Sequence, residues 1–276
     1  MDMQNRIQTS SAFHSQQLPG KRVVVASAKG GAGTTSLVAN IAWGLSQKPD
    51  THIACADLDF ITGDLDLQLS FKPNNALLEM LQYPDRLEPV VYERSGVKVT
   101  SNLSAFTGYQ AQLEQGFWPE FYEFEQFSAF CQQQASYLVW DLPAFSLRDQ
   151  VGFGALRSSD IRVVIVEPTL ASIRRTNLLL AELDSTAQQR TLLVLNHTKP
   201  ESASLITSED VAKAIGRRPD VEIPYAPELM VASTTLGKLA IAQKSRTAKA
   251  LNQLVSMIQG EHTEKHSGLF GWLKGA

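Results

Sequence analysis

Short apolar runs alternate with longer segments of helical periodicity along most of the chain. Seven runs have the length and apolar content of strands, at 22–26, 52–56, 97–101, 137–140, 161–166, 191–195 and 221–223. Apolar residues recur at helical spacing at 35–47, 75–81, 121–130 and 245–258. Strands that alternate with helices are typical of a mostly parallel sheet covered on both faces. The sequence therefore predicts one three-layer α/β domain over 21–260.

The two ends of the chain depart from this pattern. Residues 1–20 are rich in Gln and Ser and have no sustained periodicity, which predicts a disordered extension. The tail 261–276 gathers four apolar side chains between two lysines: Leu269, Phe270, Trp272 and Leu273. On a helix these four share one face. The tail is therefore predicted either to lie on a membrane surface or to pack on its own domain or a partner.

A glycine-rich stretch joins the first predicted strand to the first predicted helix. It reads Lys29, Gly30, Gly31, Ala32, Gly33, Thr34, Thr35 and Ser36. Glycines let backbone N–H groups curl round an anion without a Cβ in the way, and the helix N-terminus adds unpaired donors. Thr35 stands where such a loop places its Mg²⁺-binding hydroxyl. The stretch predicts a phosphate-binding loop and the P-loop NTPase version of the α/β fold; the alternative is a glycine turn without a ligand.

Two positions of this loop are unusual. The pattern G-x-x-x-x-G-K-S/T has lysine where this chain has Thr34, and an additional lysine, Lys29, precedes the glycines. The early lysine resembles the deviant Walker A loop of the MinD/ParA family. In that family it reaches across a dimer to the phosphates of the partner's nucleotide. The resemblance implies a homodimer formed across ATP and Mg²⁺, in which Lys29 has this catalytic role and residues 30–36 bind the nucleotide.

Acidic residues follow two of the predicted strands. Asp57 and Asp59 come after 52–56, and Asp141 comes after 137–140. The carboxyl ends of parallel strands face the ligand crevice of an open α/β sheet, so these carboxylates are expected beside the loop. Asp141 has the pattern of a Walker B carboxylate that holds Mg²⁺ through water. The family resemblance implies that Asp59 faces the catalytic water and Mg²⁺, with Asp57 in support.

Further positions nearby have open interpretations. Asp64 and Asp66 fit a solvated acidic loop, and Arg148 is expected on the switch II loop after Asp141. An Asn at the end of strand 191–195 reads the adenine edge in the family, which implies that role for Asn196. An ordinary turn asparagine fits the same spacing. Pro224 stands where family members run their backbone past the base.

Composition narrows the class of protein further. The net charge of −3 and pI near 6.0 give no basic excess, so nucleic acid is not expected as the main partner. No apolar run reaches the ~18 residues of a membrane span, and the first residues lack a signal-peptide core, which predicts a cytoplasmic protein. Cys55 and Cys131 lack metal-ligand spacing, and Cys55, which lies in an apolar strand run, is expected to be a buried free thiol. A nitrogenase-reductase-like electron carrier is therefore disfavoured.

Four stretches resemble the TadZ/CpaE branch of pilus-assembly proteins within this superfamily. They are SAKGGAGTTSLVANIAWGLS, ADLDFITGDLDLQL, LVWDLPAFSLRDQ and NALLEMLQYPDRLEPVV. That branch often lacks the P-loop lysine, as this chain does at Thr34. The resemblance implies an ATP-binding localisation factor for tight-adherence (Flp-type) pilus assembly, placed at the cell pole or the inner face of the membrane. Pilus-secretion proteins would be its partners.

The absence of the P-loop lysine at position 34 affects the expected rate of ATP hydrolysis. Thr34 donates a hydrogen bond but brings no charge, and charge-assisted hydrogen bonds are roughly twice as strong as neutral ones. Charge that develops on the γ-phosphoryl group would be poorly stabilised, so slow or negligible hydrolysis is expected. The alternative is an active ParA/MinD-type ATPase that positions plasmid, chromosome or other cargo, against which Thr34 counts.

Overall fold

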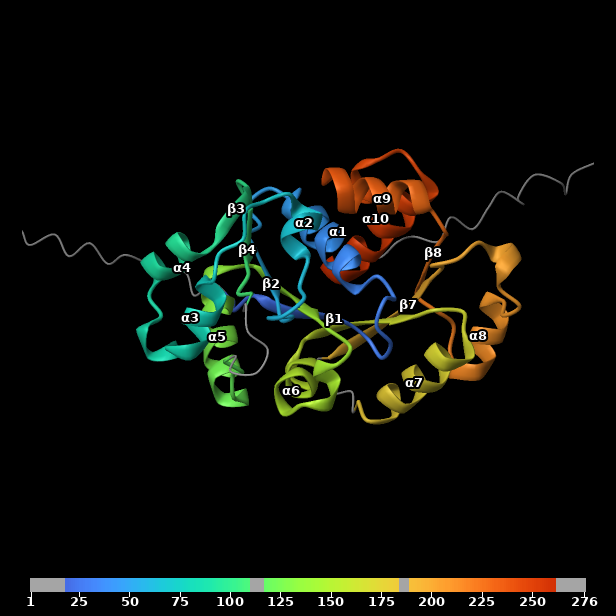
Figure 1. The fold of residues 1–276 in the computed structure, drawn as a ribbon, viewed down its shortest axis with the longest axis horizontal. Helices are drawn as coiled ribbons and strands as arrows, with labels where there is room; N and C mark the ends of the chain where they lie inside the picture. The colour runs from blue at the N-terminus through green and yellow to red at the C-terminus, as the bar shows by residue number, and fades with distance from the viewer. Residues whose placement is uncertain (1–17, 110–116, 184–188, 262–276) are drawn as a thin grey trace, which may run out of the picture.

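The computed structural model describes residues 18–109, 117–183 and 189–261 (Figure 1). Eight strands form one sheet in the order β3-β4-β2-β5-β1-β6-β7-β8. They are β1 Lys21–Ser27, β2 Ile53–Asp57, β3 Val97–Thr100, β4 Leu103–Phe106, β5 Tyr137–Leu142, β6 Ile161–Val166, β7 Arg190–Asn196 and β8 Val221–Ile223. Only β3 and β4 pair antiparallel, at one edge; the other neighbours are parallel.

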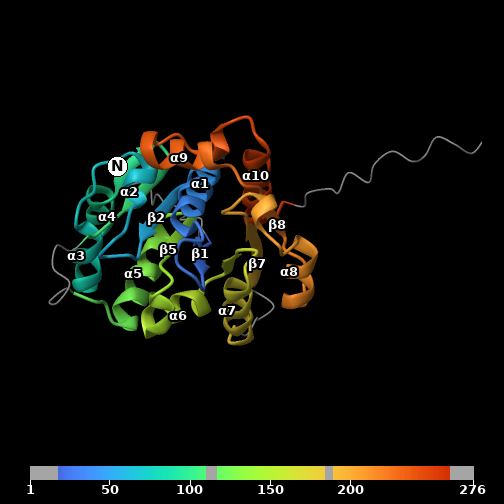
Figure 2. The same ribbon diagram turned by 45° about the vertical axis from the view of Figure 1, so that its right-hand side comes forward.

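Helices cover both faces of this sheet. One face carries α1 Thr34–Ser46, α2 Leu65–Leu69, α9 Pro227–Leu236 and α10 Arg246–Gln259. The other carries α3 Ala76–Gln82, α4 Pro89–Ser95, α5 Phe121–Gln134, α6 Gln150–Ser158, α7 Leu170–Ala181 and α8 Ser208–Ile215. Short 3₁₀ turns lie at Pro84–Arg86, Ser146–Arg148, Glu201–Ala203 and Ala240–Ala242. Figure 2 shows α1, α9 and α10 on one side of the strands and α5, α6 and α7 on the other.

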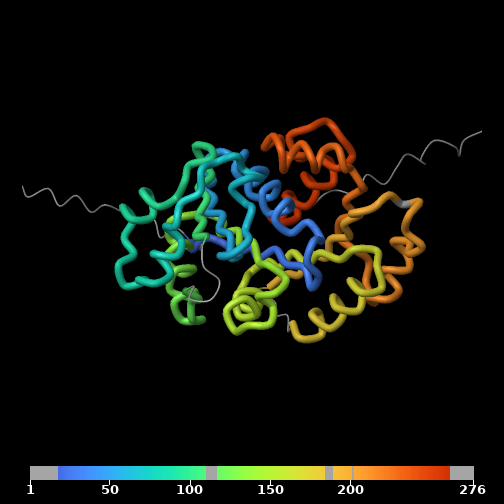
Figure 3. Tube along the Cα trace, in the orientation of Figure 1, coloured from blue at the N-terminus to red at the C-terminus, as the bar shows by residue number. Residues whose placement is uncertain are grey.

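The alternation of strand side chains explains the two layers of core. Val23 and Val25 of β1 pack with α1 and α10, whereas Val24 and Ala26 face α5 to α7. All four are fully buried, as expected for a parallel strand in the middle of a sheet. Figure 3 shows this early segment, in blue, at the centre of the molecule. The loop that follows β1 therefore emerges from the best-packed part of the fold.

The predicted α/β architecture, with a mostly parallel sheet between two helical layers, is confirmed. The prediction missed β4, a strand of four residues that follows β3 after a tight turn and lies between β3 and β2. It also missed α2, α4, α6, α7, α8 and α9. The aromatic stripe at 121–130 does form α5, whose Phe124 and Phe127 pack on Trp140 of β5.

The ends of the chain lie mostly outside this description. The predicted extension falls within it only at 18–20, and the predicted tail 261–276 only at Glu261. In the part of the chain that the structure covers, no helix combines the length and apolarity needed to cross a bilayer.

Candidate functional site

The predicted phosphate-binding loop connects β1 to α1. Gly31 and Gly33 have φ angles of 77° and 90°, in the left-handed region that favours glycine. α1 begins at Thr34 with Gly33 as its N-cap, and no side chain caps the helix. Its first backbone N–H groups therefore remain available to an anion. A Cβ built on Gly30 or Gly31 would meet no atom within 4 Å, so the backbone of this turn faces open space.

Asn196 supports this loop from the end of β7. Its Nδ2 donates to the carbonyl oxygen of Ala32 at 2.8 Å, and a Cβ on Gly33 would lie 2.8 Å from the same nitrogen. Asn196 is buried, and neither it nor half-buried Pro224 lines the cavity described below. Contact of these two residues with a base stays a prediction. The contact with the loop was missed because it joins residues 164 positions apart.

Asp57 and Asp141 are register partners at the ends of β2 and β5. Both are buried. Asp57 accepts hydrogen bonds from the backbone N–H of Asp59 at 2.8 Å and from the Tyr109 hydroxyl at 3.0 Å. Burial nevertheless raises the pKa of Asp57 to about 7. Burial, together with the nearby charge of Asp57, raises the pKa of Asp141 as well, so this edge of the sheet disfavours two bare negative charges.

Thr35, at the start of α1, is hydrogen-bonded to two of the carboxylates beside the loop, those of Asp141 and Asp64. Hydrogen bonding from Thr35 lowers the pKa of Asp141 and of Asp64, partly offsetting the effect of burial on each. Asp66 is buried, so its interpretation as part of a solvated acidic loop is wrong, whereas Asp64 is half-buried. Asp66 faces the Tyr109 hydroxyl at 3.1 Å. The chain turns back at 59–64, so that Asp64 lines the cavity described below whereas Asp66 does not, and no local sequence signal indicated this.

Asp59 is held in a turn of its own. Its Oδ1 accepts from the backbone N–H groups of Ile61 and Thr62, and its Oδ2 accepts from the Thr62 hydroxyl at 2.8 Å. These bonds fix the carboxylate close to the end of β2. Asp59 and Thr62 both line the same cavity as the loop.

A cavity of about 970 Å³ opens beside the loop. It is lined by the loop, by residues 59–64, by Asp141 and 143–148, and by parts of α6 and α7. This volume lies in the range of small-molecule and cofactor sites. The loop supplies backbone donors for phosphate, and Thr35 with Asp141 offers the oxygen ligands that Mg²⁺ prefers, so the residues present fit Mg·nucleotide.

A self-contained metal cage is not part of this site. Within the described ranges, no group of three or more His, Cys, Asp or Glu side chains is arranged to hold a metal ion. Mg²⁺ in phosphate-binding sites is held by one or two protein ligands, phosphate oxygens and water. The arrangement around Thr35 and Asp141 is consistent with that kind of site.

Lys29 does not line this cavity, and it forms an ion pair within its own chain. Its Nζ lies 2.5 Å from Oε2 of Glu167, the residue that follows β6. The Thr198 hydroxyl donates to the other carboxylate oxygen, Oε1, also at 2.5 Å. The Glu167 side chain is 4% exposed and that of Lys29 is 34% exposed. Neither Glu167 nor Thr198 was predicted from the sequence as a partner of the loop lysine.

Two arginines also line the cavity. Arg148 lies at the end of the 3₁₀ turn after β5, on the predicted switch II loop, and Arg175 lies on α7. Arg175 was not singled out in the sequence. Cys55 is a buried free thiol, as predicted; Cys131 is one as well, and neither lines the cavity.

Comparison with known proteins finds MinD proteins among the relatives of this chain. No family model matches the chain. It is 24% identical over 272 residues to the septum site-determining protein MinD of Helicobacter pylori, covering 92% of this chain and 97% of that protein. It is 23% identical to Thermotoga maritima MinD, covering 88% of this chain and 89% of the relative.

Solved structures share the fold. A ParA family ATPase from Chlorobium tepidum superposes with a TM-score of 0.75 and 27% identity, covering 86% of this chain and 98% of that one. MinD in the MinC:MinD complex of Aquifex aeolicus gives a TM-score of 0.72 and 20% identity, with coverage of 88% and 97%. The chain is thus similar in sequence to MinD proteins, and it shares the fold of ParA and MinD ATPases over most of its length.

Proposed function

We propose that the chain binds Mg·ATP, dimerises with it, hydrolyses it slowly or not at all, and serves as a localisation and scaffold protein for tight-adherence (Flp-type) pilus assembly. The observation that carries this proposal is Thr34. It stands in the lysine position of a loop that is otherwise complete, with glycines at the left-handed positions and an uncapped helix N-terminus.

The electrostatics of the site support a role for a bound cation. Asp57 and Asp141 lie buried side by side with raised pKa values, an arrangement that a divalent cation would stabilise in its charged form. Thr35 and Asp141 would hold Mg²⁺, which supplies charge neutralisation for the phosphates when bound. The loop N–H groups of residues 30–36 would bind the phosphates, and Asp59 would orient a water molecule.

Dimerisation across the nucleotide rests on Lys29. The lysine lies at the end of β1, beside the loop, in the position from which the related family reaches a partner. ATP stabilises a dimer if it binds that state more tightly than the monomer. Under this proposal nucleotide acts as a conformational ligand, and the pilus-secretion machinery recognises the dimer.

Similarity to curated MinD proteins favours a second candidate, an active ParA/MinD-type ATPase that positions cellular cargo. This candidate requires measurable turnover that a partner stimulates. The two candidates share ATP, Mg²⁺ and a homodimer, and they differ in hydrolysis and in partners. A cytoplasmic location at the pole or the inner membrane face, with lipid contact through 261–276, is compatible with both.

Light scattering with ATP, ADP and no nucleotide tests the shared part of the proposal. Wild type should form dimers only with ATP, and Lys29→Ala should remain monomeric. Steady-state ATPase measurements and pull-downs against pilus-secretion proteins then separate the candidates. A chain that stays monomeric at every nucleotide would refute the dimer switch, and fast partner-stimulated hydrolysis would favour the second candidate.

A further inference from the structure

We propose that Arg148 and Arg175 supply, from the same chain, the positive charge that Thr34 does not bring to the phosphate-binding loop. The inference rests on the proposed binding of Mg·ATP and adds two residues to that site. It assigns the nucleotide phosphates as their ligand. Both arginines line the cavity that contains Thr34, Thr35 and Asp141.

The charge balance of the cavity requires such a source. Four acidic side chains line it: Asp59, Asp64, Asp141 and Glu182. Among the described residues, Arg148 and Arg175 are the only cations in the lining. Lys29, the remaining cation of the loop, is paired with buried Glu167. A triphosphate entering this negative cavity would therefore meet its only fixed positive charges at these two arginines.

Both guanidinium groups are available. In the described ranges, neither side chain has a hydrogen-bond, ion-pair or ring partner, and both residues are exposed. The acid next to Arg148 is engaged elsewhere, because the Asp149 carboxylate caps α6 by accepting from the Gly152 N–H at 2.7 Å. Arg22, by contrast, is committed to structure, because it pairs with Glu125.

The positions suit a ligand that lies between them. Arg148 follows the strand end that carries Asp141, and Arg175 lies on α7 with Leu178 and Leu179 in the same lining. The cavity thus has one arginine near the predicted metal site and one on the helix that follows β6. A guanidinium presents a planar fork of donors that matches phosphate oxygens, and its charge-assisted bonds are strong ones.

Binding of a fluorescent ATP analogue with Mg²⁺ tests the proposal on the full chain. Arg148→Ala and Arg175→Ala should each weaken binding by roughly threefold to thirtyfold, and the double variant by more. Thr34→Lys added to the double variant should restore most of the affinity, because it returns the charge by the usual route. Pyrophosphate as competitor should show the same order, since the arginines contact phosphate.

Arg174→Ala is the matched control, because Arg174 is exposed on the same helix but does not line this cavity. It should bind as wild type does, and thermal melts should show every variant folded. Wild-type affinity in the double variant, with wild type itself binding Mg·ATP, would overturn the inference and leave the proposed function standing. A wild-type chain that does not bind Mg·ATP would overturn both.

Discussion

Lys29 and Glu167 form an ion pair that ties the phosphate-binding loop to the end of β6. The carboxylate is buried, and it has Thr198 as its second partner. If Lys29 is to reach the nucleotide of another subunit, this pair must break and leave a buried carboxylate without its cation. Breaking one side of a buried ion pair is costly, so the contact would oppose the proposed dimerisation. The free energy of the proposed dimer would then include the cost of releasing Lys29.

Substitution of Glu167 tests whether its ion pair with Lys29 opposes formation of the dimer. Glu167→Gln keeps the hydrogen bond with Thr198 but removes the charge that holds Lys29. We expect the dimer to form at about tenfold lower protein concentration with ATP, which corresponds to about 1.4 kcal/mol. Light scattering over a concentration series measures this shift. Glu79→Gln, on exposed α3, is the matched control, and an unchanged or weaker dimer in Glu167→Gln would show that the pair does not restrain Lys29.

The raised pKa of Asp57 predicts a pH dependence of stability for the metal-free chain. The folded protein holds a proton on Asp57 up to about pH 7, whereas the unfolded chain releases it near 3.8. Since the folded state binds more protons between these values, the free energy of unfolding should fall as pH rises through this range and level off above it. Each unit corresponds to about 1.4 kcal/mol, so a decrease of a few kcal/mol is expected.

Urea denaturation in EDTA at about pH 5 and about pH 7.5 measures this decrease. Asp59, Asp66, Asp141 and Tyr109 surround the carboxyl or lie close to it, so the comparison uses the variant Asp57→Asn rather than the wild-type slope alone. The variant should lose much of the dependence on pH. Equal slopes in wild type and variant would mean that Asp57 is charged throughout the range.

The sequence predicted the parts of the site that are local. The loop 29–36, Thr35 and the strand-end acids Asp57 and Asp141 are recognisable because strand, turn and helix follow one another directly. The partners of these residues are not local. Lys29 and Glu167 are 138 positions apart and meet only because β1 lies next to β6 in the sheet. Strand order is not readable from periodicity, so contacts that depend on it could not be predicted.

Asn196 offers a test between two roles. Its amide holds the loop through the carbonyl of Ala32, and the family resemblance implies that it reads the base. Removing a buried hydrogen bond costs about 1 kcal/mol or somewhat more. If the support role dominates, Asn196→Ala should weaken ATP and GTP binding by the same factor and lower thermal stability. Competition of ATP and GTP for one fluorescent analogue measures both; a loss confined to ATP would instead establish base reading.

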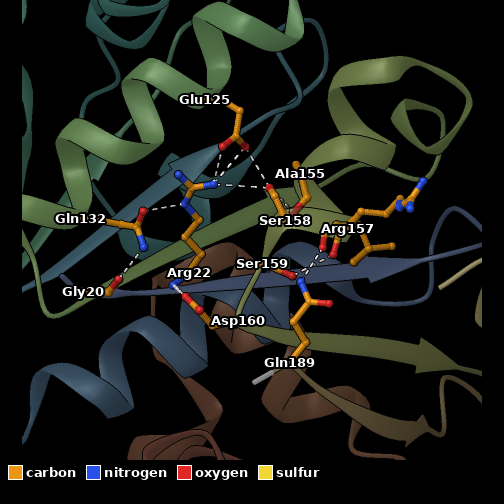
Figure 4. A network of polar contacts seen from close by, with 11 residues as sticks. Gly20, Arg22, Glu125, Gln132, Ala155, Arg157, Ser158, Ser159, Asp160 and Gln189 are labelled. Carbon is orange, nitrogen blue, oxygen red and sulfur yellow. Dashed lines mark hydrogen bonds and ion pairs between the residues drawn. The ribbon is translucent and has the colours of Figure 1, made fainter. Parts of the chain in front are cut away.

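A polar network lies at the start of β1, at the end of the strand away from the phosphate-binding loop. It leads to a prediction about the stability of the fold alone. Arg22 is buried, and its guanidinium contacts Glu125 at 2.8 Å, Gln132 at 2.8 Å and Ser158 at 3.4 Å, as Figure 4 shows. These contacts tie β1 to α5 and α6. Glu125→Ala would leave the buried guanidinium without its counter-charge, which should cost about 2 kcal/mol, discounted because Glu125 is itself partly exposed.

A matched variant separates lost charge from lost packing at this network. Arg22→Met together with Glu125→Ala removes both charges, and it should be less destabilised than Glu125→Ala alone, because no unpaired charge remains buried. Neither variant should alter Mg·ATP affinity, since the network joins the strand at the end away from the loop and none of its residues lines the cavity. Thermal melts and nucleotide titrations on the same samples decide this. Nucleotide binding that fell along with stability would mean that strain at the start of β1 reaches the phosphate-binding loop through the strand.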